Sequence, residues 1–432
     1  MLLDWLGQGM VVLTVVGSLI LCLVIVAMAN LLRRHLALRP QGLAMEARWL
    51  ARPLPPDDAL PHVVVQIPVF NEGAIVERAV ASAARLDWPI DKLHIQICDD
   101  SDDATTELAR AAAQRAGAAG IDIAVVRRPD RSEFKAGNLK HAMAQTGHDY
   151  FAIFDVDFVP APDFLRRCMA VLLAEPGFGF VQARIDFLNA NENALTRAQA
   201  IMLDYHYGFD LATRSWAQQV VHFNGSGGIW RRAAIEAAGG WSGDTLLEDW
   251  DLSFRAWLKG WRGVVITSVT AAGELPAGLG ALMLQRRRWA AGGTQVAWKM
   301  LPLLAGNRTS LAQHWNGLLH LASSFAHSGF AATLIVAIAA MVLRPSSALM
   351  LGAMLYAVLA GASVLLFAGA IVTYRIVRRR TSWTRFVLDF PLVLMLNLYT
   401  SWAILQSLPG ALLGRSHIFE RTPKRGTIPS PR

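Results

Sequence analysis

The chain has few cysteines and few charged residues. Its three cysteines, Cys22, Cys98 and Cys168, have the spacing of neither a metal site nor a disulfide framework. This usage is typical of a reducing compartment. Charged residues make up only 17% of the chain, whereas hydrophobic residues make up 53%. Such a composition is too apolar for an ordinary soluble enzyme.

The formal net charge of +8 could indicate a nucleic-acid-binding protein. The arginines, however, cluster at the ends of apolar segments, where membrane topology and anionic lipid account for them. We therefore expect a lipid bilayer as a partner, and no nucleic acid.

Residues 10–32 form an almost uncharged run, about as long as the ~20 residues that span a bilayer as a helix. The run is too long for a signal-peptide core and has no basic flank before it. Arg33, Arg34 and Arg39 follow it, whereas Asp4 alone carries charge before it. The positive-inside rule therefore predicts an external N-terminus and a cytoplasmic side after residue 32.

From His62 to about Thr270, short apolar strands alternate with helices. Strands are expected at 63–67, 94–98, 123–126, 150–154, 178–183 and 263–267, with helices such as 75–85 and 104–116 between them. This alternation predicts a largely parallel sheet covered on both faces. Ligands of such sheets bind at the carboxyl ends of the strands.

The last third of the chain predicts membrane helices. Residues 275–299 mix Arg, Trp, Leu and Met, which indicates an amphipathic helix on the membrane surface. Apolar segments follow at 316–343, 348–374 and within 386–413. Three full crossings there would leave the basic tail outside, against the charge rule. Either the third segment is re-entrant or interfacial, or residues 300–343 cross twice.

Acidic residues follow two of the predicted strands. Asp99 and Asp100 end the second strand, where carboxylates can hydrogen-bond a nucleotide, although residues 102–103 could equally cap the next helix. Asp155 and Asp157 follow the strand at 150–154 and can share a divalent cation with a diphosphate.

Four further segments carry polar or aromatic residues suited to a phosphorylated substrate. Lys135 can add a phosphate contact. Asp249 is our candidate base for a hydroxyl nucleophile, although residues 248–251 also suit the positive end of a helix. Arg and Trp in Gln285–Trp289 can pair with a diphosphate and stack on a sugar. The glycine-rich turn at 222–228 would let backbone approach an acceptor.

In this order, the motifs resemble those of a family 2 glycosyltransferase of the cellulose synthase-like, processive type. Four segments are similar to signatures of that family. Asp99-Asp100 is similar to its Asp signature, and Asp155-Val156-Asp157 to its Asp-x-Asp signature. Leu247-Glu248-Asp249 is similar to its Thr-Glu-Asp signature, and Gln285–Trp289 to its Gln-x-x-Arg-Trp signature. The resemblance is closest to the glucomannan mannosyltransferase-like branch and its bacterial relatives.

The resemblance implies an α/β nucleotide-diphospho-sugar transferase domain, GT-A-like with a Rossmann-like mixed sheet, attached to an α-helical transmembrane bundle. It also implies Mg²⁺ or Mn²⁺ as cofactor. Position by position, the resemblance implies that Asp249 and Glu248 are catalytic and that Asp155 and Asp157 bind the metal. The implied donor-binding residues are Pro68, Asn71, Glu72, Asp99, Asp100, Lys135, Asn138 and Asp155. The implied acceptor- or diphosphate-binding residues are Phe223, Asn224, Gly225, Gln285, Arg288 and Trp289, and the gating-like residues are Phe419, Thr422 and Lys424.

Three positions depart from the family pattern. Leu247 stands where Thr is usual, and Arg421 stands where the gating segment usually has Val. The sequence also ends soon after Lys424, so we expect no regulation by a cyclic-dinucleotide sensor domain of this chain.

We expect five segments: a transmembrane helix with its basic flank (1–45), a cytosolic transferase domain (60–272), interface helices (273–305), transmembrane segments (306–414) and a cytosolic tail (415–432). The hypothesis is an inverting enzyme that moves hexose from UDP-glucose or GDP-mannose onto a β-linked polysaccharide, with translocation through its own helices. A bacterial inner membrane is the expected location. The alternative is transfer of one sugar to a ceramide, diacylglycerol or polyprenyl lipid.

Overall fold

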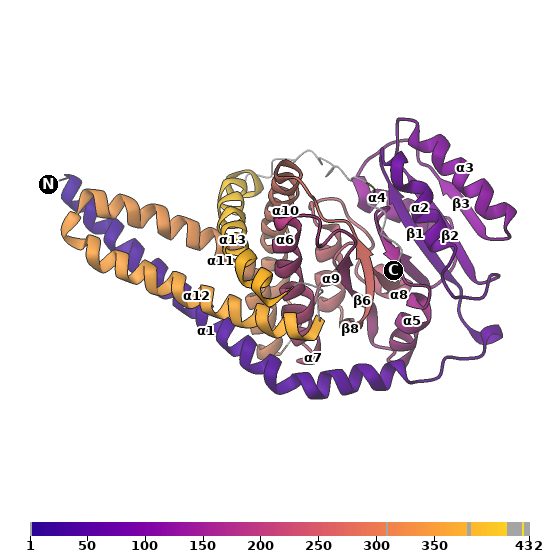
Figure 1. The fold of residues 1–432 in the computed structure, drawn as a ribbon, viewed down its shortest axis with the longest axis horizontal. Helices are drawn as coiled ribbons and strands as arrows, with labels where there is room; N and C mark the ends of the chain where they lie inside the picture. Colours follow the sequence, from indigo (N-terminus) through magenta and orange to yellow (C-terminus); the bar gives the residue numbers. More distant parts are fainter. Residues whose placement is uncertain (1, 308–309, 378–381, 413–425, 427–432) are drawn as a thin grey trace.

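The structure is a computed structural model that describes residues 2–307, 310–377, 382–412 and 426. An α/β domain occupies one end of the molecule, and a narrow arm of long helices extends from it (Figure 1). The N-terminus lies at the far end of the arm.

The α/β domain is built on one mixed sheet of eight strands in the order β3-β2-β1-β4-β7-β6-β8-β5. The strands are β1 (Val63–Val69), β2 (Leu93–Asp99), β3 (Asp122–Val126), β4 (Tyr150–Ile153), β5 (Val159–Pro160), β6 (Phe178–Phe187), β7 (Gly228–Arg231) and β8 (Arg262–Gly273). Parallel pairing joins β3, β2, β1 and β4, and also β6 to β8. β7 runs antiparallel to both neighbours, and β5 runs antiparallel to β8. The predicted fold class is confirmed, but the sequence did not reveal β5 or β7.

Helices connect and cover the strands. They are α2 (Gly73–Ala83), α3 (Thr105–Ala118), α4 (Phe134–Ala144), α5 (Phe164–Ala174), α6 (Ala194–Asp204), the π-helix η2 (Tyr205–Leu211), α7 (Ala212–Trp216), α8 (Arg232–Ala237) and α9 (Glu248–Leu258). In α2 the buried apolar residues are Ile75, Val76, Ala79, Val80 and Ala83, a helical stripe facing the core. The strands they cover are buried along nearly their whole length, as expected for a sheet covered by helices.

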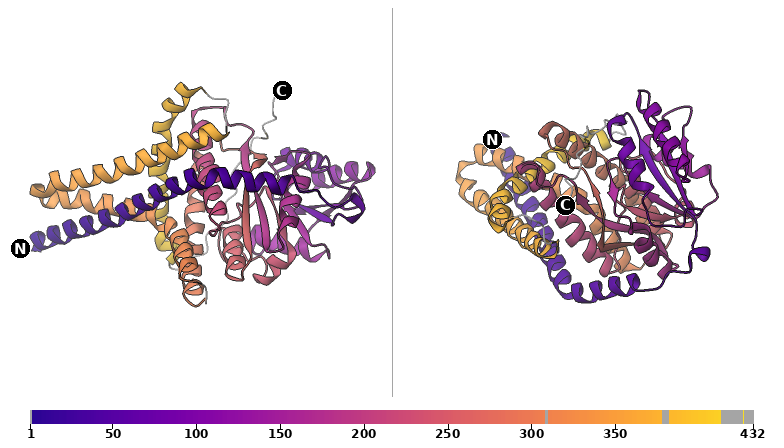
Figure 2. Two further views of the ribbon diagram at one scale, coloured as in Figure 1. Left: turned by 90° about the horizontal axis from the view of Figure 1, so that it is seen from below. Right: turned by 45° about the vertical axis from the view of Figure 1, so that its right-hand side comes forward.

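The first helix, α1 (Leu2–Leu50), extends well beyond the predicted membrane segment. Its 49 residues would measure about 74 Å at ~1.5 Å per residue. Its first half lies in the arm, and its second half lies along the α/β domain (Figure 2). There the carboxylate of Glu46 accepts hydrogen bonds from Thr267 N at 3.0 Å and from the Trp216 indole at 3.1 Å. The helix thus connects the arm rigidly to the domain.

Two further helices complete the arm. α11 (Leu311–Leu343) runs outward and α12 (Ala348–Val377) returns, joined by the short helix η3 (Pro345–Ser347). Gly7 of α1 lies against Arg344 beside this turn. α11 is one helix, so the structure does not support the alternative in which residues 300–343 cross twice.

The last helix, α13 (Trp383–Leu412), crosses the base of the arm beside α10 (Leu279–Ala305) instead of running along it (Figures 1 and 2). The carboxylate of Asp389 pairs with Arg197 of α6 at 2.6 Å. This arrangement favours the interfacial alternative for the third segment. By length and composition, three helices among the described residues could cross a membrane: 3–50, 345–374 and 383–406.

Candidate active site

One pocket lies at the carboxyl ends of β1, β2 and β4, beside the first turn of α9 and one side of α10. It brings together most of the predicted site residues: Pro68, Glu72, Asp100, Lys135, Asn138, Asp155, Asp157, Asn224, Gly225, Glu248, Asp249, Gln285, Arg288 and Trp289. These residues come from segments far apart in the sequence. Parallel strands bring them together, because their carboxyl ends meet at one edge of the sheet.

Lys135, on α4, lies at the centre of the charged groups. Its Nζ donates to Asp155 Oδ1 at 2.6 Å and to Gly225 O at 2.9 Å, and it lies 3.9 Å from Glu248 Oε1. Burial alone would lower the pKa of Lys135, but the charges of Asp155 and Glu248 more than offset this and raise the pKa. Lys135 therefore remains an ammonium ion where a diphosphate would need positive charge.

Asp249 has a perturbed ionisation. Burial, and then the neighbouring charge of Glu248, raises the pKa of Asp249 to about 7, although Lys135 opposes the shift. Both residues lie in the first turn of α9, and Asp249 Oδ1 accepts a hydrogen bond from Trp250 N at 2.8 Å. A carboxylate with a pKa near neutrality is suited to general base catalysis, because it is partly ionised and still a competent proton acceptor.

The turn before β7 needs glycine at position 225. Gly225 has a φ of +75°, and a Cβ there would lie 3.2 Å from Asp249 Oδ2 and 3.4 Å from Lys135 Nζ. The next residue, Ser226, accepts a hydrogen bond from Asp155 N at 2.9 Å through its Oγ. The turn thus positions three of the charged groups that line the pocket.

The oxygen ligands of Asp155 and Asp157 fit a hard divalent cation. The Asp155 side chain is 39% exposed toward the pocket. Asp157 is buried, and its Oδ2 accepts a hydrogen bond from Glu274 N at 3.0 Å. No third His, Cys, Asp or Glu among the described residues completes a protein-only metal cluster here. The pair suits an ion that takes its remaining ligands from diphosphate and water.

The two carboxylates at the end of β2 differ in their surroundings. Asp100 lines the pocket and is held by Arg128, whose Nε and Nη2 donate to its two oxygens at 2.8 and 2.7 Å. Asp99 is buried outside the pocket, and its oxygens accept from Ser101 N at 2.9 Å and Thr106 Oγ1 at 2.7 Å. Of the two, only Asp100 is placed to meet a nucleotide.

Two other predicted residues also lie outside the pocket lining. Phe223 is fully buried in the hydrophobic core, and its side chain does not line the pocket. Asn71 donates its side-chain amide to Asp102 at 2.7 Å and links two loops. The gating-like residues Phe419, Thr422 and Lys424 lie outside the described residues.

Helical spacing explains the Gln-x-x-Arg-Trp pattern on α10. Gln285, Arg288 and Trp289 are three and four residues apart, so they share the helix side that faces the pocket. Arg286 is buried, with its guanidinium 5.0 Å from the Trp289 ring centroid. Burial lowers the pKa of Arg288, and the charges of Glu248 and Asp155 oppose that shift. Arg288 therefore lies beside the same carboxylates that surround Lys135.

Sequence reasoning missed three polar residues that line the pocket: Arg131, Tyr207 and Glu274. The Arg131 guanidinium lies 3.2 Å from the ring centroid of Phe70. Tyr207 belongs to η2, and π-helices occur frequently at functional sites. Glu274 directly follows β8, and its carboxylate pairs with Arg78 at 2.7 Å. No motif in the sequence indicates these three residues.

Comparisons with known proteins bear on the family and the fold of the chain. A family model described as glycosyl transferase family group 2 matches residues 150–370. Glucomannan 4-beta-mannosyltransferase 1 of Oryza sativa subsp. japonica is 37% identical over 303 residues, which are 66% of this chain and 58% of the relative. Glucomannan 4-beta-mannosyltransferase 2 of Arabidopsis thaliana is 39% identical over 272 residues, 61% of this chain and 51% of the relative. The chain thus spans about half the length of these relatives.

Among solved structures, mannosyltransferase PcManGT from Pyrobaculum calidifontis, in complex with GDP-Man and Mn²⁺, superposes with a TM-score of 0.54. The match covers 89% of this chain and 98% of that one, at 20% sequence identity. At that identity the likeness establishes a shared fold.

Proposed function

The chain belongs to glycosyl transferase family group 2, and from that premise we propose that it transfers hexose from a nucleotide sugar onto a growing β-linked polysaccharide at a membrane. The observation that carries the proposal is the pocket in which Lys135 and Asp155 lie beside Asp249 and Trp289. It combines a place for a charged leaving group, a base and a flat apolar surface.

We assign the donor to the carboxyl ends of β1, β2 and β4. Asp100 would accept hydrogen bonds from the nucleoside, and Lys135 and Arg288 would pair with diphosphate oxygens. Arg128 holds Asp100 in place through two hydrogen bonds, at 2.8 and 2.7 Å. Because the Asp100 carboxylate is already held in one orientation, little conformational entropy is lost there when the donor binds.

Mg²⁺ or Mn²⁺ would be held by Asp155 and Asp157. When bound, such an ion neutralises charge on a leaving diphosphate. Asp155 is also paired with Lys135 at 2.6 Å, so donor binding with the ion would redistribute the contacts of that lysine.

Asp249 would act as the base. It would take the proton of the acceptor hydroxyl, while the hydroxyl oxygen forms a bond to the anomeric carbon and the bond from that carbon to the diphosphate oxygen breaks. Attack from the side opposite the leaving group inverts the configuration and gives a β linkage from an α-linked donor. Glu248 would act by raising the pKa of Asp249, and Trp289 would stack on the acceptor sugar.

The donor is proposed to be GDP-mannose, with UDP-glucose as the other candidate. Support comes from the relatives named glucomannan mannosyltransferases and from the similar fold solved with GDP-Man. Helices α1 and α12, long and apolar enough to cross a membrane, would hold the enzyme there together with α11, which lies beside them in the arm (Figure 1). Although α13 is also long enough to cross, it lies across the base of the arm (Figure 1), so we place it at the membrane surface. Translocation of the product through these helices, and a bacterial inner membrane as location, stay predictions; the relatives named above come from plants.

Membranes that contain the chain, incubated with labelled nucleotide sugars, test the proposal. We expect GDP-mannose to label insoluble material that a β-mannanase releases, and membranes with Asp249→Asn to give none. Label extracted into organic solvent would instead identify a lipid acceptor, and label from UDP-glucose alone would change the donor. If none of the labelled nucleotide sugars tested gave labelled product, the result would contradict the proposal.

A further inference from the structure

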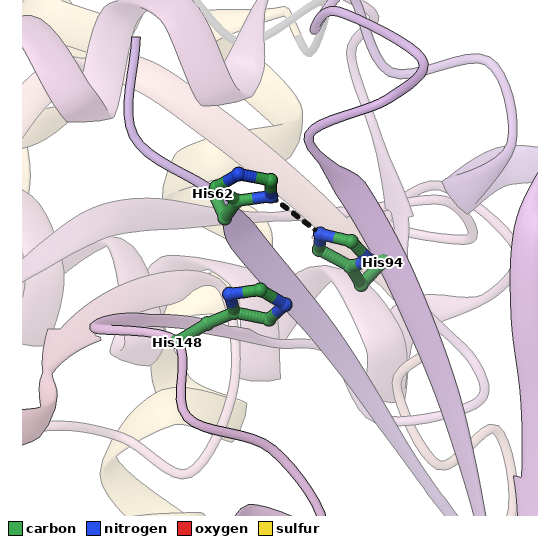
Figure 3. Close-up of side chains that lie close together, drawn as sticks. All are labelled: His62, His94 and His148. Atoms are coloured by element: carbon green, nitrogen blue, oxygen red, sulfur yellow. Dashed lines mark hydrogen bonds between the residues drawn. The ribbon is translucent and has the colours of Figure 1, made fainter.

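Three histidines, here called the histidine cluster, lie together at the amino edge of the sheet (Figure 3). His62 directly precedes β1, His94 is the second residue of β2, and His148 lies two residues before β4. β1 is seven residues long. At ~3.3 Å per residue, the cluster is about 20 Å from the carboxyl edge, where the active-site pocket lies.

The imidazole nitrogens are close enough to share one ion. His62 Nδ1 lies 2.8 Å from His94 Nε2, and one ligand atom from each histidine lies within 4.8 Å of the other two. The rings of His94 and His148 stack at a centroid distance of 4.2 Å. Two nitrogen lone pairs would repel each other at 2.8 Å, so one of the two nitrogens carries a proton and donates it to the other in a hydrogen bond.

A carboxylate fixes the orientation of one of these rings. Asp122 faces His94 across the β2–β3 pair, and its Oδ2 lies 2.5 Å from His94 Nδ1. The carboxylate can only accept, so Nδ1 carries the proton and the Nε2 lone pair faces His62. A carboxylate behind a histidine in this way raises the basicity of the other nitrogen and is the usual support of a metal-binding histidine.

The backbone that carries the cluster is also fixed. The ammonium of Lys92 donates to three carbonyls of the preceding loop, including Leu60 O at 2.8 Å, which holds the chain just before His62. Arg232 Nε donates to His148 O at 2.7 Å. Side chains held on rigid backbone lose little further freedom when they bind an ion, and this favours tight binding.

We propose that the histidine cluster binds a divalent late transition-metal ion, Zn²⁺ in the first place, through one nitrogen of each histidine. Imidazole suits such ions, whereas carboxylates suit Mg²⁺, so this site would be distinct from that at Asp155 and Asp157. The proton between His62 and His94 would leave, and these nitrogens would move apart by about 0.5 Å to reach zinc–nitrogen distances of ~2.0–2.1 Å. The rings of His62 and His148 would turn out of their stack on His94, which terminal sp³–sp² torsions allow at little cost, while Asp122 keeps the His94 ring in place.

The bound ion would join the starts of three neighbouring strands. His62 is exposed and the other two histidines are half-buried, so a water molecule can complete a tetrahedral site. An ion that binds only the folded chain stabilises it by mass action. We therefore expect Zn²⁺ to raise the thermal midpoint of the α/β domain.

Zn²⁺ titration of the purified, chelator-treated full chain tests this proposal. The titration is run against a coloured competing chelator, with Mg²⁺ in excess to occupy carboxylate sites. We expect one tight equivalent for the wild type, and its loss in both His94→Gln and His148→Gln. His141→Gln, which changes a histidine of α4 outside the cluster, is the matched control and should bind like the wild type.

Asp122→Asn keeps all three ligands and should weaken Zn²⁺ by about 10- to 100-fold, which a merely misfolded variant would not reproduce. Co²⁺ in place of Zn²⁺ should give the visible absorption of a tetrahedral site in the wild type and in His141→Gln, and no such absorption in His94→Gln or His148→Gln. Zn²⁺ binding that is equal in the wild type and His94→Gln, or absent from both, overturns the proposal. Neither result bears on sugar transfer, which is measured separately.

Discussion

The two edges of the sheet carry polar clusters of different character. At the carboxyl edge, Lys135, Asp155, Glu248 and Asp249 are charged groups drawn together from helices and loops that are distant in the sequence. At the amino edge, three imidazoles and Asp122 lie on or just before neighbouring strands. The same strands thus present a charged pocket at one end and a group of nitrogen ligands at the other.

The two edges of the sheet differ in how strongly their side chains influence one another. The groups of the carboxyl edge are half-buried beside one another, and their charges shift each other's pKa values. The imidazoles lie beside one another with a single carboxylate, that of Asp122, against His94. We therefore expect changes at the carboxyl edge to affect sugar transfer strongly, and changes at the amino edge to affect it hardly at all.

The largest effect is expected from Asp249→Asn, which keeps the shape of the side chain and removes the base. Transfer should fall by about 10³-fold, within the range for loss of a general base, while donor binding persists. Asp244→Asn is the control, because that carboxylate lies outside the pocket lining and pairs with Lys299. Its effect on transfer should stay within about twofold, as for surface changes. Full activity of Asp249→Asn would remove this residue from the reaction.

Gly225→Ala should lower transfer by about 10- to 100-fold, because misplacement of reacting groups by ~1 Å can cost that much. The added Cβ would press on Asp249 Oδ2 and strain a φ of +75°. Gly240→Ala is the matched control: its φ is +81°, but a Cβ there meets nothing within 4 Å. Assays at equal folded fraction should show the loss only at position 225. Equal losses would mean that backbone strain alone is responsible.

Trp289→Ala should weaken the acceptor by about 1 kcal/mol, or roughly fivefold in acceptor KM, through the loss of a stacking surface. Trp298→Ala is a control on the same helix, since Trp298 is 58% exposed and outside the pocket lining. Initial rates over a range of acceptor oligosaccharide concentrations give kcat and the acceptor KM for each variant. An unchanged acceptor KM in Trp289→Ala would place the acceptor elsewhere.

The smallest effect on transfer is expected from His94→Gln. The histidine cluster lies about 20 Å from the pocket, at ~3.3 Å per strand residue, so the transfer rate without added Zn²⁺ should change by less than about twofold. The same assay on Asp249→Asn provides the contrast between the two edges. A loss of transfer in His94→Gln as large as that in Asp249→Asn would show that the edges do not act independently.

The sequence predicted the strands of the parallel half of the sheet well, because β1, β2 and β4 are short apolar runs bounded by polar turns. It missed β7, whose four residues begin with a glycine and follow a glycine-rich turn. It also missed β5, which has only two residues. β5 and β7 are strands because they pair with long neighbouring strands, and a local sequence pattern does not predict such pairing.

The site was predicted where a motif places its own side chains, as at Lys135 and Asp249. Sequence reasoning could not separate Asp99 from Asp100, because their difference depends on Thr106 and Arg128, which approach from other elements. It could not find Glu274 either, whose backbone N–H meets Asp157 across 117 residues of chain.

The pH dependence of kcat/KM for transfer tests most directly the claim that the half-buried carboxylate of Asp249, beside the charge of Glu248, is the base. Asp249 must be ionised to accept a proton, and its pKa is raised to about 7. The rate should therefore be full well above that pH and fall tenfold per pH unit below it. In Glu248→Gln, which removes a charge that raises this pKa, the inflection should move to lower pH. A wild-type profile that stays level down to pH ~5, near ordinary carboxyl pKa values, would contradict the account.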